Sequence, residues 1–176
     1  VETVIWLYQQ RHRNPVLPGS DEQRVFLDRL WKEGRWSEAY LAWLNGLNER
    51  QQQGLGTVYN GGFELPITGI GFDWRMEAPR GTLVEVAETY GTRGGQALHV
   101  AFNGQRVRFQ HVQQSLYLEP GAYRLQGRAR PDGLRAERGL RWTVRCVGSE
   151  TRLLAESDAF AGSDDLAFDS LDSVFP

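Results

Sequence analysis

The chain has 176 residues, of which 40% are hydrophobic and 11% aromatic. This composition is typical of a packed globular protein and excludes a disordered one, and the length suits one substantial domain with an appendage or two small domains. The formal net charge of −2 gives no general reason to expect nucleic acid as a partner. The sequence has no run of about 18 apolar residues, so we expect no membrane span.

The N-terminal part of the chain has helical periodicity. Residues 2–13 are predicted to form a helix that ends before Pro15, because the residue before a proline disfavours the helical region. A second helix is predicted to begin at Ser20, where Gln23 completes a capping-box pattern, and to end at Gly34. Its apolar residues recur at helical spacing: they are Phe26, Leu27, Leu30 and Trp31.

A third helix is predicted from Trp36 or Ser37 to about Gln51, with a polar linker that reaches Gly56. The turn and this helix carry a spaced pattern, which consists of Gly34, Trp36, Ala39, Trp43 and Gly46. The pattern resembles the turn and second helix of a tetratricopeptide repeat, with Gly46 in place of the usual alanine. The match covers one repeat, whereas a stable solenoid needs about three or more. Either further repeats precede Val1, or this helix pair docks on the rest of the chain.

Three tryptophans belong to this helical part: Trp31, Trp36 and Trp43. We expect them to fill the interface between the helices. The alternative is a peptide-binding groove, although one repeat makes almost no concave surface.

After Gly56 the hydrophobic period changes from helical to alternating. Residues alternate between apolar and polar over 98–102, 123–130 and 140–146, and glycine-containing turn signals separate these segments. Alternation of this kind predicts antiparallel strands with one wet face. Trp142 and Cys146 fall on the apolar face of the last segment, so both are expected in the core. Short strands with no helix between them predict a sandwich or a jelly roll.

Four elements occur in order along this half of the chain: Asn60-Gly61-Gly62-Phe63-Glu64, Phe72-Asp73-Trp74, residues 94–100 and residues 114–125. Together they resemble a carbohydrate-binding module of the family 4/9/22 type over about residues 57–176. The resemblance implies an α+β chain in two parts: a short tetratricopeptide-repeat-like helical segment over 1–56, and an antiparallel β-sandwich jelly roll over 57–176. In this resemblance, Tyr59 to Glu64 is the entry strand.

The resemblance departs from the family at the C-terminal end. The family closes with a further strand after a Phe-x-x-Pro-like segment, whereas this sequence stops at Val174-Phe175-Pro176, and residues 164–172 are rich in Asp and Ser. We therefore expect the last strand to be missing, disordered or cut off, which would leave an open sheet edge.

The polar face of the predicted strands is rich in arginine and glutamine. If the strands are neighbours, these side chains crowd one surface, and guanidinium groups bind carboxylate, phosphate or sulfate in bidentate fashion. The hypothesis is a binding face for an acidic polysaccharide, and the alternative is a solvated face whose arginines pair with nearby glutamates. The candidate residues are Arg108, Gln110, Arg124, Arg128, Arg141 and Arg145.

Sugar binding also calls for an exposed aromatic ring, and three side chains are candidates: Trp74, Tyr90 and Tyr117. Trp74 is preferred because it lies in an irregular stretch between turn residues, although a role in covering the core fits it equally well. In sandwiches of the resembling type, a structural calcium often lies near the first strand. Glu64 holds the matching position, and Asp73 or carbonyls around residues 93–94 would assist.

The sequence contains none of the common catalytic motifs that we sought, such as His-Glu-x-x-His or Gly-x-Ser-x-Gly. We therefore expect no enzyme. The expected function is a non-catalytic carbohydrate-binding-like module of a bacterial repeat-containing protein that handles surface or exopolysaccharide, with an extracytoplasmic location favoured. The alternative is a protein–protein scaffold without a sugar ligand. Beyond the calcium, no cofactor is expected.

Overall fold

The computed structural model describes residues 20–134, 136, 139–148, 151–160 and 169–175. The chain divides into two compact units, Val1–Tyr117 and Leu118–Pro176. The predicted helix over residues 2–13 lies outside the described residues. None of the described helices is long and apolar enough to cross a membrane.

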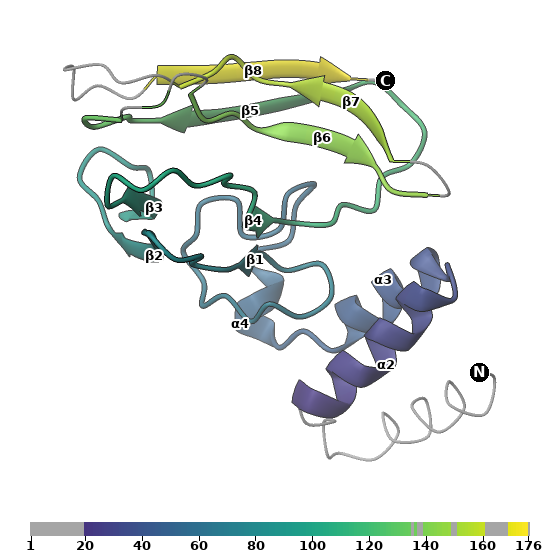
Figure 1. Ribbon diagram of the computed structural model, residues 1–176. Helices are drawn as coiled ribbons and strands as arrows, with labels where there is room; N and C mark the ends of the chain where they lie inside the picture. Colours follow the sequence, from purple (N-terminus) through teal and green to yellow (C-terminus); the bar gives the residue numbers. More distant parts are fainter. Residues whose placement is uncertain (1–19, 135, 137–138, 149–150, 161–168, 176) are drawn as a thin grey trace. The chain divides into compact units, whose positions relative to one another are not determined.

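The first unit begins with helices and continues with two small antiparallel sheets (Figure 1). Its helices are α2 (Ser20–Lys32), α3 (Trp36–Asn45) and α4 (Glu49–Gln52), and its strands are β1 (Arg75–Met76), β2 (Thr82–Glu88), β3 (Gln96–Phe102) and β4 (Val112–Gln113). Strand β2 pairs with β3, and β1 pairs with β4. The sequence analysis missed β2, although Val84-Glu85-Val86 alternates as a strand does.

The predicted end of helix α2 at Gly34 is confirmed. Gly34 has a φ of +69°, which glycine adopts without steric cost. The Gly34 N–H donates to the carbonyl of Trp31 at 3.0 Å, and the Arg35 N–H donates to the carbonyl of Leu30 at 3.0 Å. These two bonds form a Schellman motif, which satisfies carbonyls at the end of the helix.

The predicted third helix is two helices. Helix α3 ends before Gly46, and a new helix, α4, begins after Asn48. The Asn48 side chain accepts from the N–H of Gln51 at 2.9 Å, and the Gln51 side chain accepts from the N–H of Asn48 at 2.9 Å. This capping box satisfies two N–H groups at a helix start, which explains why the chain restarts a helix there.

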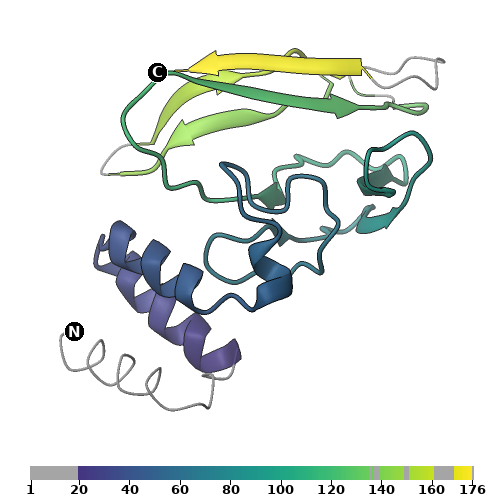
Figure 2. The same ribbon diagram turned by 180° about the vertical axis from the view of Figure 1, so that it is seen from behind.

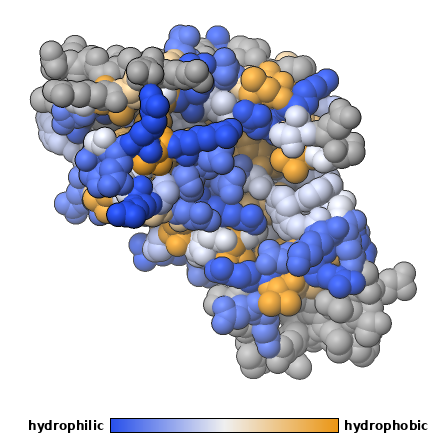
Figure 3. Space-filling view, viewed as in Figure 1, coloured by the Kyte–Doolittle hydropathy of each residue, from blue (hydrophilic) through white to orange (hydrophobic). Residues whose placement is uncertain are grey.

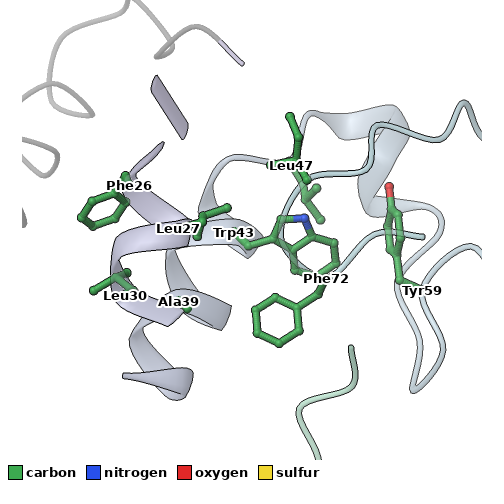
Figure 4. Close-up of a cluster of buried hydrophobic side chains, with 9 residues drawn as sticks. Phe26, Leu27, Leu30, Ala39, Trp43, Leu47, Tyr59 and Phe72 are labelled. Atoms are coloured by element: carbon green, nitrogen blue, oxygen red, sulfur yellow. The ribbon is translucent and has the colours of Figure 1, made fainter. Parts of the chain in front are cut away.

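The core of the first unit lies between the two long helices and the irregular segment that follows them (Figure 4). Trp43 from α3 is 3% exposed and packs against Tyr59 and Phe72, with ring centroids 5.0 and 5.5 Å away. Phe72 also contacts Trp31 at 5.2 Å, and Trp31 meets Trp36 edge to face at 4.8 Å. The expectation that the three tryptophans fill an interface is confirmed, and the helix pair packs on the segment that follows it.

Asn60 organises that segment. It is 4% exposed and has a φ of +46°, a left-handed conformation that asparagine tolerates better than most residues. Its side-chain amide donates to the Leu65 carbonyl at 2.8 Å, and its side-chain oxygen accepts from the Leu65 N–H at 3.0 Å. Phe63 is also left-handed, with a φ of +60°. The predicted entry strand at Tyr59–Glu64 is therefore wrong: these residues form a turn, because positive φ values are incompatible with a strand.

The described residues of the second unit form four strands: β5 (Tyr123–Ala129), β6 (Thr143–Cys146), β7 (Arg152–Glu156) and β8 (Asp169–Phe175). Strand β5 pairs antiparallel with β8, β6 pairs antiparallel with β7, and β7 lies next to β8. Both ribbon views show β5 and β8 side by side (Figure 2). A strand therefore forms over residues 169–175, and the expectation that the further, closing strand of the family is missing, disordered or cut off stays a prediction.

The alternation predicted for β5 is confirmed, since exposed and half-buried residues alternate along its length. The alternation predicted for β6 fails at its end. The register between β6 and β7 shifts between Val144 and Arg145, and such an irregularity interrupts the regular alternation of side chains between the two faces. Trp142 and Val144 are half-buried, but Cys146 is exposed, so the expectation of a core thiol is wrong.

The described residues thus form helices followed by two-stranded antiparallel sheets, and no closed sandwich is formed among them. The domain boundary between residues 56 and 57 stays a prediction. The core of the first unit already includes side chains from both sides of that position, such as Trp43 and Phe72.

We predict that Trp43→Ala destabilises the first unit by about 3–5 kcal/mol, since it leaves a cavity beneath three aromatic rings. Leu41→Ala on the same helix is the control, because Leu41 is 58% exposed and its loss is expected to cost within about 0.5 kcal/mol. Urea unfolding followed by circular dichroism measures both. Equal effects of the two changes would contradict the described core.

Asn60→Ala is expected to cost about 2–4 kcal/mol, because it removes two hydrogen bonds and leaves alanine, which tolerates a left-handed conformation less well than asparagine, at a positive φ. Asn45→Ala, at the exposed end of α3, is the matched control. Urea unfolding of both variants tests this prediction, and an unchanged midpoint for Asn60→Ala would argue against the described turn.

Candidate ligand-binding site

The structure places the predicted arginine face on three separate segments. Arg108 and Gln110 lie between β3 and β4 in the first unit, whereas the other candidates lie in the second unit on β5 or on the stretch around β6. Strand β5 pairs with β8, and β6 pairs with β7. The arginines of β5 and β6 are therefore not on hydrogen-bonded neighbours, which was the condition for crowding on one surface.

Strand β5 carries the most regular of these segments. Arg124, Gln126 and Arg128 are exposed, while Leu125 and Gly127 between them are half-buried. Successive residues on one face of a strand are about 7 Å apart, so the three polar side chains form a straight row. Arg124 and Arg128 also have interactions within the protein. The row is therefore a polar face on one side of β5.

The segment around β6 is built differently. The Arg141 guanidinium donates to the Glu156 carboxylate on β7 at 3.1 Å, and both side chains are substantially exposed. An exposed pair of this kind contributes about 1 kcal/mol or less to stability. For Arg141 the structure shows the ion pairing that the sequence analysis gave as its alternative. Arg145 is exposed beside the register shift of the strand.

The third segment follows β3. Arg108 and Gln110 are exposed and alternate with Val107 and Phe109, which are half-buried. Phe109 packs edge to face on Phe102 of β3, with the ring centroids 5.5 Å apart. The apolar residues thus anchor the segment, and the two polar candidates face water.

The three aromatic candidates differ sharply in exposure. Trp74 is 7% exposed, its indole N–H donates to the Asn60 carbonyl at 3.2 Å, and its ring packs on Phe63 at 5.1 Å. Trp74 thus takes the core-covering role, and its burial leaves no open ring face for a sugar. Tyr117 is 38% exposed and stacks on Tyr40 at 5.1 Å, whereas Tyr90 is 96% exposed. Tyr90 is therefore the aromatic candidate with a free ring.

Glu64 lies against the turn that precedes β3. Its carboxylate accepts from the N–H of Gln96 at 3.1 Å, and a β-carbon on Gly94 would approach that carboxylate to 2.1 Å. Gly94 is thus a glycine because the carboxylate occupies the space where a side chain would be.

The proposed calcium ligands do not gather at Glu64. The Asp73 carboxylate accepts from the Thr68 N–H at 2.6 Å, from the Thr68 hydroxyl at 2.7 Å and from the Trp74 N–H at 2.7 Å. Among the residues with a described position, no three His, Cys, Asp or Glu side chains form a group that could hold a metal. Calcium takes about six or more oxygens, so the described residues do not fit it.

Asp73 has an electrostatic effect on its surroundings. It is 2% exposed, and it lies in the same irregular segment as Tyr59, which is 4% exposed. Burial, and then the negative charge of Asp73, raise the pKa of the Tyr59 hydroxyl above its ordinary value of 10.0. Both effects penalise the tyrosinate anion.

Tyr90 was predicted from the sequence as an aromatic candidate, and the carbonyls around residues 93–94 as calcium ligands, but the Arg93 side chain and the hairpin that carries both residues were not predicted. Residues 89–95 connect two alternating strands and contain three glycines, Gly91, Gly94 and Gly95. Recognition of β2 would have shown that these residues form the tip of a hairpin.

Comparison with protein-family models, with curated proteins and with solved structures finds no match for this chain.

We predict that the free energy of unfolding falls as the pH rises above about 10, and that part of this fall comes from Tyr59. At alkaline pH the unfolded state releases the Tyr59 proton before the folded state does, because folding raises the pKa of Tyr59. The contribution of Tyr59 to stability is therefore complete below about pH 10 and is lost as the pH rises through the raised pKa. Tyr59→Phe should make the decline shallower. Tyr90→Phe, at the exposed tyrosine, is the control. Urea unfolding at a series of alkaline pH values tests the difference.

Proposed function

We propose that the chain is a non-catalytic carbohydrate-binding-like module whose ligand is an acidic polysaccharide. In this proposal it belongs to a bacterial repeat-containing protein that handles surface or exopolysaccharide outside the cytoplasm. The helical segment is tetratricopeptide-repeat-like, and the strands after residue 56 belong to a β-sandwich of the jelly-roll type.

The observation that carries the proposal is the polar row on β5. Arg124, Gln126 and Arg128 are all exposed on one face of a regular strand. Guanidinium groups bind carboxylate and sulfate as forked donors, and an extended anionic chain offers such groups at intervals.

The strand arrangement supports the fold part of the proposal. Strand β8 pairs with β5 across the intervening β6 and β7, and jelly rolls and Greek keys bring together strands that are distant in sequence. The space-filling view shows a largely hydrophilic surface with scattered hydrophobic residues (Figure 3), which suits a polar ligand more than a large apolar partner.

A scaffold without a sugar ligand is the second candidate. Two apolar side chains on the helices favour it: Val25 of α2 is 70% exposed and Leu41 of α3 is 58% exposed. Apolar side chains of this kind are suited to contact with another helix. The arginines would then be structural, as Arg141 is in its pair with Glu156.

Titration calorimetry at low salt with an oligomer of galacturonic acid tests the proposal. We predict that the protein binds this oligomer and that Arg124→Gln/Arg128→Gln weakens binding by about 100-fold or more, because the two charged hydrogen bonds that are lost contribute about 1.5–3 kcal/mol each. The control, Arg24→Gln/Arg50→Gln, removes the same charge from exposed positions on α2 and α4 and should leave binding nearly unchanged.

An oligomer of galactose, which lacks the carboxylates, should bind much more weakly. Circular dichroism of each variant checks that it is folded. If the unmodified protein binds no acidic oligomer, the carbohydrate proposal is wrong and the scaffold becomes the better interpretation.

A further inference from the structure

The tip of the β2–β3 hairpin presents an aromatic side chain that takes no part in the packing of the protein. Tyr90 is 96% exposed, whereas the residue before it, Thr89, is 9% exposed. Exposed tyrosines do occur singly on protein surfaces, so the exposure alone carries little. The exposure of Tyr90 becomes informative because hydrogen bonds fix the turn that carries it.

This turn is held by its own hydrogen bonds. The Thr89 N–H donates to the Gly95 carbonyl at 2.7 Å, and the Thr92 hydroxyl donates to the Thr89 carbonyl at 3.0 Å. The Gly95 N–H in turn donates to the Thr92 hydroxyl at 2.9 Å. The Thr89 hydroxyl bonds to the ring nitrogen Nε2 of His99 on β3 at 2.6 Å. The turn is therefore braced on both sides of Tyr90.

A second brace comes from outside the hairpin. Glu64 accepts from the N–H of Gln96 at 3.1 Å and fills the space over Gly94. Glu64 belongs to the turn that the buried side chain of Asn60 organises. The tip is thus tied to the packed part of the first unit, so its shape is fixed before any ligand arrives.

The residues around Tyr90 leave it accessible. Gly91, Gly94 and Gly95 have no side chains, and the nearest large polar group in the turn is the exposed Arg93. The turn therefore combines an aromatic ring, a guanidinium group and peptide groups that no side chain covers. Recognition surfaces are often built from such groups on a rigid loop, and tyrosine and arginine contribute much of their binding energy.

We propose that the Tyr90–Arg93 turn is a binding subsite for a uronic acid residue. The C–H face of the sugar ring packs on the Tyr90 ring, and the sugar carboxylate bonds to the Arg93 guanidinium. This inference rests on the proposed function and names the sugar class, and it moves the aromatic contact from the buried Trp74 to Tyr90.

The test uses the full chain, an oligomer of galacturonic acid and titration calorimetry. Tyr90→Ala should weaken binding about tenfold, as expected for an exposed aromatic anchor, and it should leave the urea midpoint unchanged because the side chain is 96% exposed. Tyr90→Phe keeps the ring and should bind as the unmodified protein does. Arg93→Gln should reduce binding of the acidic oligomer and leave binding of the galactose oligomer unchanged.

Amide chemical shifts give an independent readout. Addition of the galacturonate oligomer should shift the signals of Gly91, Gly94 and Gly95, and Tyr90→Ala should abolish these shifts. If both Tyr90→Ala and Arg93→Gln bind normally while Arg124→Gln/Arg128→Gln does not, the subsite is disproved and the proposed function stands. Equal losses for Tyr90→Phe and Tyr90→Ala would disprove ring packing. No binding by the unmodified protein would disprove both the subsite and the proposed function.

Discussion

The buried amide of Asn60 is the constraint on which the arrangement of the first unit depends. The side-chain amide bonds both to the carbonyl and to the N–H of Leu65. The backbone carbonyl of Asn60 accepts from the indole N–H of Trp74. A buried peptide group without a partner costs about 1–3 kcal/mol, and this single side chain satisfies two of them. The segment after the helices can therefore be irregular and still be packed, which lets it bring Tyr59 and Phe72 onto Trp43.

The same constraint connects the core to the candidate sites. Fixing residues 60–65 places Glu64 over Gly94, and that contact holds the tip of the β2–β3 hairpin. In the second unit no such side chain is needed on β5, because backbone pairing with β8 already holds Arg124 and Arg128 on one face. The two units thus hold their exposed polar groups in different ways. In the first unit the Glu64 carboxylate holds the turn, and in the second unit the backbone hydrogen bonds between β5 and β8 hold the strand.

Features set by neighbouring residues could be predicted from the sequence. The helix end at Gly34, the interface tryptophans and the alternation of β5 each follow from spacing over a few residues. The turn at Asn60 and the burial of Trp74 depend on contacts between distant segments, so a motif resemblance placed a strand there instead. Cys146 was misplaced because the alternation ends at the register shift, after which Arg145 and Cys146 are both exposed. The arginine face was predicted as one surface because strand order, which separates β5 from β6, is not encoded locally.

The pairing of β5 with β8 also bears on how the protein is made. The strand that completes the β5 ladder is synthesised after β6 and β7. Until then one edge of β5 displays unpaired peptide groups, and pairing across a long intervening segment is slow. The nascent second unit is therefore open to strand exchange between chains. The exposed charges of Arg124 and Arg128 oppose that exchange, since like charges on two nascent β5 strands repel each other.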